Sequence, residues 1–198
     1  MKCHYCSNES EFKCTVCGRF LCAEHAQLRT VCPNCTVKAE VEYSVERATG
    51  AARSEIRKLV RSFWGEEEQL TFDRSFVVAE LSGSIARVKD KLAGFVSLAE
   101  VDDAMIVVAL GVLPQYQGLG IGKRLVEEAA DEAVRRKKKW LLVSTSNDDL
   151  PALGFYQSVG FQIYDVKPNV IAEKHGRVLV GIGKLPVRDE LRLRKKLN

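Results

Sequence analysis

Seven cysteines and one histidine near the start of the chain have the spacing of metal ligands. The chain has 198 residues, and all of its cysteines lie between Cys3 and Cys35. Four close pairs contain the candidate ligands, which are Cys3, Cys6, Cys14, Cys17, Cys22, His25, Cys32 and Cys35. Structural zinc takes four nitrogen or sulfur ligands in a tetrahedral site. These ligands therefore fill two sites with no position left for water, so we expect two structural Zn²⁺ ions in residues 1–38.

A disulfide framework is the alternative interpretation of these cysteines. Their number is odd, the first 30 residues are too polar for a signal peptide, and the pairs are spaced like metal knuckles. These observations favour zinc and a reducing, cytoplasmic setting. A segment this short cannot bury enough apolar surface to fold alone, so metal binding is expected to supply the missing free energy.

The spacing resembles that of the cross-brace fingers of the B-box and AN1 types. In those fingers the first and third pairs share one ion, and the second and fourth pairs share the other. The resemblance implies one site of Cys3, Cys6, Cys22 and His25 and a second of Cys14, Cys17, Cys32 and Cys35. The last pair departs from both families, which usually end in histidine ligands. Because the segment has no basic helix and few aromatic residues, we expect it to bind a protein or to dock on the rest of the chain.

A second chemical signal is a glycine-rich segment at residues 110–123, which runs from an apolar strand into a helix. Gly118, Gly120 and Gly122 allow the backbone to approach a ligand without clashes from Cβ atoms. The free amides at the start of the helix, the helix dipole and Lys123 all favour an anion. The segment is therefore predicted to hold a phosphate or pyrophosphate. Its spacing fits neither a Walker A loop nor the dinucleotide fingerprint.

The elements that must position this segment follow from the hydrophobic pattern after residue 40. Alternating and apolar runs predict strands, and apolar residues at helical spacing predict helices. The predicted order is β-α-β-β-β-α-β-α-β with a weak signal for one more strand, at about residues 41–48, 54–65, 84–88, 92–98, 105–112, 121–137, 140–144, 150–159, 161–166 and 187–193. Residues 66–75 are polar and are expected to be a loop. The chain thus divides into a finger at 1–38 and an α/β domain at 39–198.

Two motifs make this second domain resemble the GNAT family of N-acetyltransferases. The family's Q/R-x-x-G-x-G/A motif fits in two registers between residues 115 and 122. Farther along, Ala152, Tyr156, Gly160 and Phe161 match the pattern A-x3-Y-x3-G-F. The resemblance covers a core of about residues 41–166, followed by an extension at 167–198. It implies an α/β (α+β) fold with a mixed, mostly antiparallel central sheet.

The resemblance also implies acetyl-CoA as co-substrate, an amine as acceptor, and roles for individual residues. The main chain of Leu110, Gly111 and Val112 would pair with the pantetheine arm. Backbone amides would hold the pyrophosphate at Gln117, Gly118, Leu119, Gly120, Ile121, Gly122 and Lys123. Asn147 would contact the cofactor or substrate, and Tyr156 would be the general acid that protonates the leaving thiolate. The asparagine that the family usually has three residues before the alanine falls at Asp149 here.

The sequence does not point to one general base. An alkylammonium acceptor, with a pKa of about 10.4, must lose a proton before it attacks a thioester. Many relatives use a glutamate on the strand before the glycine-rich segment, but residues 105–110 contain no acid. The nearest carboxylates are Glu100, Asp102 and Asp103, and a water chain is the alternative. The alternative to an enzyme is an adaptor protein that binds acyl-CoA without turnover and uses the finger for protein interaction.

Composition limits the remaining classes of partner. The formal net charge is +4, and seven thiolates on two Zn²⁺ would change it by −7 + 4 = −3, to about +1. So small a charge argues against a nucleic-acid partner, and the basic clusters at 135–139 and 188–196 are expected to be solvated. No apolar run reaches the roughly 18 residues that a membrane span needs. The prediction is therefore a cytoplasmic N-acetyltransferase whose acceptor amine the sequence does not name.

Overall fold

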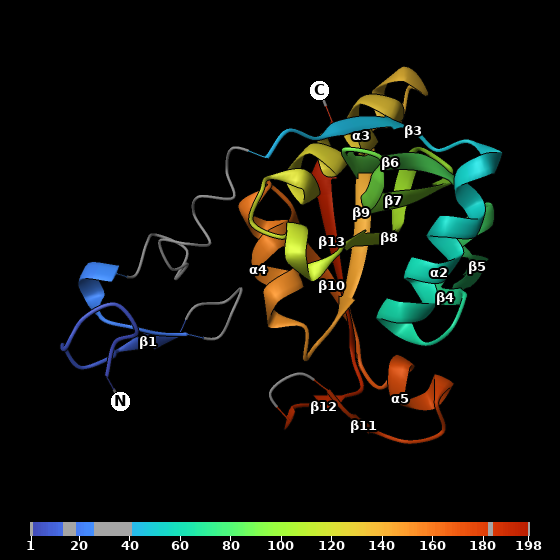
Figure 1. Ribbon diagram of the computed structural model, residues 1–198. Coiled ribbons are helices and arrows are strands. Elements are labelled where there is room, and N and C mark those ends of the chain that lie inside the picture. The colour runs from blue at the N-terminus through green and yellow to red at the C-terminus, as the bar shows by residue number, and fades with distance from the viewer. Residues whose placement is uncertain (1, 14–18, 26–40, 182–183, 198) are drawn as a thin grey trace.

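The start of the chain forms a small hairpin. In it β1 (Phe12–Lys13) pairs antiparallel with β2 (Phe20–Leu21), and a 3-10 turn, η1, follows at Ala23–His25. The Cys3 N–H donates to the Asn8 carbonyl over 3.0 Å, which closes a tight loop before the hairpin (blue in Figure 1). The computed structural model describes residues 2–13, 19–25, 41–181 and 184–197.

A seven-stranded sheet is the centre of the larger part of the chain, with the strand order β10-β13-β9-β8-β7-β6-β3. Its strands are β3 (Ser44–Arg47), β6 (Ser82–Val88), β7 (Lys91–Val101), β8 (Ala104–Val112), β9 (Trp140–Ser146), β10 (Gln162–Lys167) and β13 (Glu190–Lys196). Neighbouring strands are antiparallel except for β8 and β9, which are parallel. The predicted mixed, mostly antiparallel sheet is therefore confirmed.

Helices cover both faces of this sheet (Figure 1). On one face lie α3 (Ile121–Arg135) and α4 (Leu150–Ser158), which share a core cluster with β6, β7, β8 and β9. The buried side of α3 includes Leu125, Val126 and Ala129 at helical spacing, whereas Val134 near the end of the helix is exposed. Among the described residues, no helix is long and apolar enough to cross a membrane.

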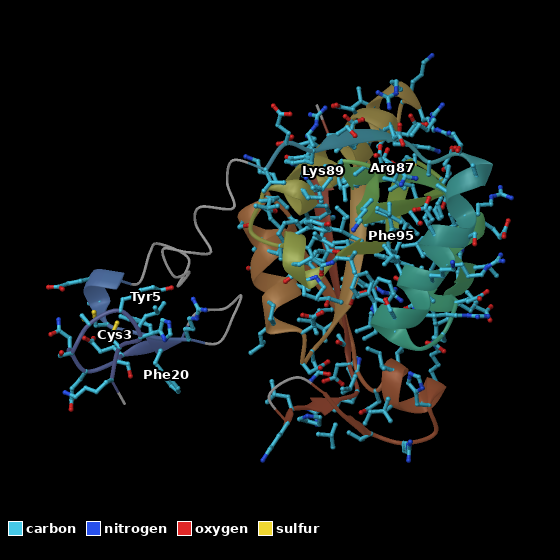
Figure 2. All side chains as sticks on the ribbon, viewed as in Figure 1. Cys3, Tyr5, Phe20, Arg87, Lys89 and Phe95 are labelled. Carbon is cyan, nitrogen blue, oxygen red and sulfur yellow. The ribbon has the colours of Figure 1, made fainter. Side chains whose placement is uncertain are left out.

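The other face is covered by α2 (Arg53–Trp64), which ends at Gly65 in the left-handed conformation. Its buried Ile56 and Val60 pack in a second core cluster around Phe95 of β7. Phe95 lies between the sheet and α2, and Arg87 lies near the start of that helix (Figure 2). There the Arg87 guanidinium holds Glu55 of α2 over 2.8 Å. The apolar cluster around Phe95 and the ion pair near the start of α2 therefore hold this helix on the sheet.

The parallel strands β8 and β9 pair for only part of their length. Their register runs from Ala104↔Trp140 to Val107↔Val143 and then stops, so the strands diverge. On its other side, β8 has an irregularity opposite Ser97 and Leu98, where Val108 is the extra residue. Beyond Val107, β8 therefore presents unpaired main-chain groups toward β9.

Two segments differ from the expected elements. The predicted loop at 66–75 is mostly a hairpin of β4 (Glu68–Thr71) and β5 (Arg74–Val77). The two residues at the tip of this hairpin, Phe72 and Asp73, both have positive φ. Glycine usually marks such a turn, and this segment has none, so the sequence does not predict the hairpin. The weak last strand is β13, and it is inserted between β9 and β10. Smaller elements complete this end of the chain, namely α5 (Val170–Lys174), β11 (Leu179–Val180) and β12 (Pro186–Val187).

Candidate active site

The glycine-rich segment forms one wall of a cavity of about 370 Å³, here called the glycine-turn cavity. Gly118 and Gly120 have φ of +81° and +84°, in the left-handed region that glycine adopts without strain. Gly120 is the N-cap of α3, so amides without an intrahelical acceptor lie at this end. Gln117 Nε2 donates to the Val112 carbonyl over 3.0 Å and ties the turn to the end of β8. This part of the wall therefore combines glycines with the free amides at the start of α3, which suits an anionic group.

Most of the residues predicted to bind the cofactor line this cavity, namely Leu110, Val112, Gln117, Gly118, Gly120, Ile121, Gly122 and Lys123. Two others have packing roles instead. Leu119 packs against the core cluster beneath α3. A Cβ at Gly111 would lie 2.6 Å from the Phe63 ring, so glycine there allows α2 to pack against β8.

A second cavity, of about 520 Å³, adjoins the first and is called here the α2–α5 cavity. Its apolar wall includes Trp64, Leu70, Ile171, Leu179 and Val187. Four residues line both cavities, namely Leu110, Asp149, Ala152 and Tyr156. Two molecules, one in each cavity, would therefore meet beside these residues, where β8 and β9 diverge.

Tyr156 is the buried aromatic residue at this junction. It is 7% exposed and makes edge contacts with Phe155 and Phe161, with ring centroids 5.3 and 5.6 Å apart. Within the described residues its hydroxyl makes no recorded hydrogen bond. Burial raises the pKa of the Tyr156 hydroxyl well above that of an ordinary phenol, and the charge of Asp149 raises it further. The phenol is therefore a proton donor at neutral pH, and a weaker acid than the sequence alone suggests.

Asp149 reaches the same junction from the start of α4. It is the N-cap of that helix, and its Oδ1 accepts the Ala152 N–H over 3.0 Å. Asp149, Ala152 and Tyr156 follow one face of α4, because residues three and seven apart lie one above another. Helical side chains lean toward the N-terminus, so the Tyr156 hydroxyl points back toward Asp149.

A buried charge network closes another side of the α2–α5 cavity. Glu190 of β13 accepts hydrogen bonds from the Phe72 N–H and the Thr71 hydroxyl over 3.1 and 3.2 Å. Its other oxygen pairs with Arg192 over 2.8 Å, and Arg192 also pairs with Asp73 over 3.0 Å. The network fixes the β4–β5 turn onto β13. The sequence does not predict this network. Alternation in the last strand places Glu190 and Arg192 on one face, but it does not show that the distant β4–β5 hairpin packs on that face.

An ion pair stands at the rim of the α2–α5 cavity. Lys174 of α5 pairs with Glu66, which follows α2, over 2.6 Å, and both line the cavity. His175, which follows α5, is exposed and also lines it. Lys174 and His175 belong to the C-terminal extension at 167–198, whereas Glu66 does not.

The carboxylates nearest to β8 in sequence lie away from this junction. Glu100, Asp102 and Asp103 line neither cavity. Glu100 pairs with Lys138 over 3.0 Å and with Arg136, and these hydrogen bonds lower its pKa. All three lie at the end of β7 and the start of β8, whereas the cavities open where β8 ends. The structure gives them no access to a molecule at the junction.

Asn147 also lies outside both cavity linings. Its Nδ2 donates to the Pro186 carbonyl over 2.7 Å, and its Oδ1 accepts the N–H groups of Arg188 and Asp189 over 3.0 and 2.9 Å. The side chain therefore attaches the segment before β13 to the end of β9. That position differs from the cofactor contact that the resemblance implies.

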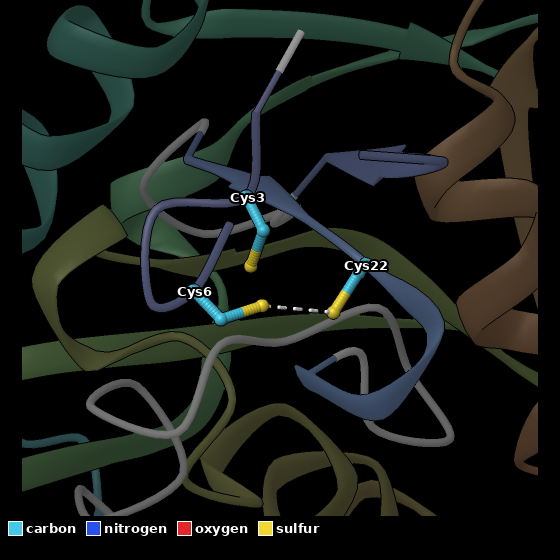
Figure 3. Close-up of side chains that lie close together, drawn as sticks. All are labelled: Cys3, Cys6 and Cys22. Carbon is cyan, nitrogen blue, oxygen red and sulfur yellow. Dashed lines mark hydrogen bonds between the residues drawn. The ribbon is translucent and has the colours of Figure 1, made fainter. Parts of the chain in front are cut away.

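Three predicted metal ligands converge in the N-terminal hairpin. The sulfur atoms of Cys3, Cys6 and Cys22 all lie within 4.8 Å of one another, and the Cys6 and Cys22 sulfurs are 3.7 Å apart (Figure 3). The Cys3 sulfur also accepts the Tyr5 N–H over 3.5 Å. This brings the first and third pairs together, as in a cross-brace. The His25 side chain and Cys14, Cys17, Cys32 and Cys35 lie outside the described residues.

Comparisons with known proteins agree with this geometry. Residues 73–163 match the family described as "Acetyltransferase (GNAT) domain". The chain is 27% identical over 139 residues to the uncharacterized protein YxbD of Bacillus subtilis, covering 68% of this chain and 86% of that protein. It is 32% identical over 99 residues to the [ribosomal protein bS18]-alanine N-acetyltransferase of Escherichia coli, covering 49% of this chain and 66% of that enzyme.

A solved structure shows the same fold. A Bacillus subtilis acetyltransferase in complex with CoA superposes with a TM-score of 0.61 at 20% identity, over 79% of this chain and 100% of the other. The diverging β8 and β9, the glycine-rich turn and the matched family agree with one another. The chain therefore carries an acetyltransferase (GNAT) domain that includes residues 73–163.

Proposed function

We propose that this protein transfers the acetyl group of acetyl-CoA to a primary amine. The observation that carries the proposal is the meeting of the two cavities at Leu110, Asp149, Ala152 and Tyr156. One cavity has a wall of free amides suited to a pyrophosphate. The other has the size and the mixed apolar and charged wall expected of an acceptor site.

Acetyl-CoA would lie in the glycine-turn cavity with its thioester at the junction. Amides of residues 117–123 would hold its pyrophosphate, and Lys123 would add a positive charge. The unpaired main chain of β8 beyond Val107 would pair with the pantetheine arm like an added strand. A backbone N–H of β8 would stabilise the oxyanion that forms at the carbonyl carbon.

Tyr156 would protonate the sulfur as the carbon–sulfur bond breaks. The expected result for Tyr156→Phe is a fall in kcat of about 10²- to 10⁴-fold, with the acetyl-CoA Kd within about twofold of the wild type. The measurement is thiol release from acetyl-CoA across alkylamines and peptides with free N-termini. Tyr164→Phe is the matched control, because Tyr164 lies on β10 outside both cavities.

Thiol release also decides between an enzyme and an adaptor. Tight acetyl-CoA binding with no release for any acceptor would show that the chain binds acyl-CoA without turnover. Unchanged turnover in Tyr156→Phe would remove the tyrosine from the mechanism and leave the enzyme proposal standing.

We infer that the N-terminal cysteines bind zinc. Three thiols at mutual ligand distance support a site of Cys3, Cys6, Cys22 and His25. The spacing of Cys14, Cys17, Cys32 and Cys35 supports a second site. Metal analysis is expected to find two Zn²⁺ per chain and one after Cys22→Ala. A metal-free wild type, or a disulfide between any of these cysteines, would contradict the inference.

The finger and the acetyltransferase part are proposed to be separate domains, 1–38 and 39–198, in a reducing cytoplasm. The finger would recruit the enzyme to a protein carrying the acceptor amine. Removing residues 1–38 is then expected to leave acetylation of a small amine unchanged and to weaken acetylation of the protein acceptor. Equal loss on both acceptors, together with lower stability, would show a structural cap instead.

A further inference from the structure

The junction of the two cavities contains one carboxylate, Asp149, which stands where the family motif usually has asparagine. Within the described part of the chain, Asp149 is the only carboxylate that lines both cavities. Its Oδ1 is occupied by the Ala152 N–H, whereas Oδ2 has no recorded hydrogen bond or ion pair among these residues. The side chain is held in one orientation by the helix cap and keeps one oxygen for a ligand.

The other carboxylates of the α2–α5 cavity are already paired. Glu66 is bound by Lys174 over 2.6 Å. Glu190 accepts hydrogen bonds on both oxygens, from Phe72 and Thr71 on one and from Arg192 on the other. Neither lines the glycine-turn cavity, so neither reaches both reactants.

The remaining titratable groups around Asp149 do not replace it. Tyr156 faces it from the same helix and stays protonated, because burial and the Asp149 charge both raise its pKa. Lys123 and Tyr116 line only the glycine-turn cavity, and Lys174 and His175 line only the α2–α5 cavity. Asp149 and Tyr156 both line the two cavities, so a carboxylate and a phenol reach the same junction.

We propose that Asp149 is the general base of the acetyl transfer, which binds the acceptor ammonium and removes its proton. The inference rests on the proposed acetyltransferase function. A carboxylate within reach of the ammonium both attracts the positive charge and accepts a proton. Because both residues line the junction, Asp149 can act on the nitrogen and Tyr156 on the sulfur.

The proton balance is closed by these two residues. Asp149 takes one proton from the ammonium, and the neutral amine attacks the thioester carbon to form the carbon–nitrogen bond. The carbon–sulfur bond breaks, and Tyr156 gives its proton to the sulfur. The nitrogen loses a second proton as the amide forms, which restores the Tyr156 phenol. Asp149 releases its proton to solvent, so one ammonium and one thioester yield one amide, one thiol and one proton.

The decisive variant is Asp149→Asn, because asparagine caps a helix as well as aspartate does but carries no charge. With an alkylamine at pH 7, kcat/KM is expected to fall about 10²- to 10³-fold. The activity should recover as the pH rises toward the amine pKa of about 10.4, since the neutral amine then needs no base. Acetyl-CoA affinity and melting temperature should stay unchanged. Asp149→Ser, another good cap, gives the same test if the first variant folds poorly.

Acetylation of an alkoxyamine shows whether Asp149 acts as a general base or only positions the acceptor. Alkoxyamines are neutral at pH 7, so wild type and Asp149→Asn should acetylate them at rates within about threefold of each other. An equal loss with both nucleophiles would overturn the proposal and leave Asp149 a positioning role. No loss with either would remove it from the reaction.

The control variant is Asp102→Asn, which changes an exposed carboxylate outside both cavities and is expected to have no effect. Failure of the inference is distinct from failure of the proposed function. In the first case the wild type turns over and Asp149→Asn matches it; in the second the wild type releases no thiol with any acceptor.

Discussion

The glycine-turn cavity and the α2–α5 cavity share four residues but are built in opposite ways. The first takes its wall from one continuous stretch, residues 110–123, and from the first turns of α4. The second takes its wall from segments spread between Trp64 and Glu190. The first wall includes three glycines and the amides at the start of α3, whereas the second has one glycine and is otherwise lined by residues with side chains.

This difference explains which ligand each cavity suits. A backbone cradle recognises a feature that never changes, such as the pyrophosphate of CoA, because amides and a helix dipole are present whatever the side chains are. A side-chain wall recognises one acceptor and excludes others through shape and charge. Variants of the first cavity should therefore alter cofactor affinity, and variants of the second should alter acceptor selectivity.

The largest effect is expected from Gly120→Val, which tests the backbone cradle. Gly120 has a φ of +84°, where a β-branched residue costs about 1–3 kcal/mol. The turn must then leave its binding conformation, and acetyl-CoA affinity measured by calorimetry should fall about tenfold to 100-fold. Gly154→Ala is the control, since a Cβ there meets nothing within 4 Å and should stabilise α4 with no effect on affinity.

The second effect concerns the buried network of the α2–α5 cavity. Glu190→Gln leaves the Arg192 side chain, 8% exposed, without its buried partner, at a cost of about 3 kcal/mol of unfolding free energy. Denaturant unfolding should show this loss, and the acceptor KM should rise while acetyl-CoA affinity holds. The double variant Glu190→Gln with Arg192→Met should regain stability. An equal loss of acetyl-CoA affinity would show that the two cavities do not bind their ligands independently.

Glu132 of α3 provides a comparison far from both cavities. Burial of its carboxyl opposes the charged form, but hydrogen bonds from Arg135 and Arg136 and the charge of Arg47 outweigh burial and lower its pKa from 4.5 to about 2. Because the folded pKa lies below the unfolded one, this stabilisation is present above about pH 4.5 and is lost as the pH falls toward 2.

Glu132→Gln should therefore lower the free energy of unfolding by about 2–3 kcal/mol at pH 7. It should also make that free energy less dependent on pH below about 4.5. Both KM values should stay unchanged. If the acceptor KM rises as it does in Glu190→Gln, then lower stability alone accounts for both results.

The smallest effect is expected from Lys174→Ala at the rim of the α2–α5 cavity. The Lys174–Glu66 pair is partly exposed, so its loss should cost less than about 1 kcal/mol. The acceptor KM is expected to change about twofold to fivefold, with acetyl-CoA affinity unchanged. A change in acetyl-CoA affinity without one in acceptor KM would reverse the assignment of the two cavities.

Local features of the fold could be predicted from the sequence to a large extent. The glycine-rich turn, the apolar strand before it and the amphipathic α3 follow from residue order alone, because they depend on neighbours within a few positions. The β4–β5 hairpin was missed, since its turn residues Phe72 and Asp73 adopt positive φ without glycine. The order of strands at the C-terminal edge was also missed, because β13 pairs with β9 across about 45 residues of intervening chain.

The resemblance to the acetyltransferase family, the glycine-rich turn and the position of Tyr156 in its motif could all be recognised from the sequence alone. Each of these depends on spacing within a short segment, where covalent geometry decides what can face a ligand. Which carboxylate lines both cavities depends instead on the tertiary structure. Glu100, Asp102 and Asp103 lie near β8 in sequence but away from the cavities, whereas Asp149 lies at the junction. The physical reason is that this position depends on where β8 and β9 diverge, and that Glu66 and Glu190 are paired with Lys174 and Arg192 by contacts between segments far apart in the chain.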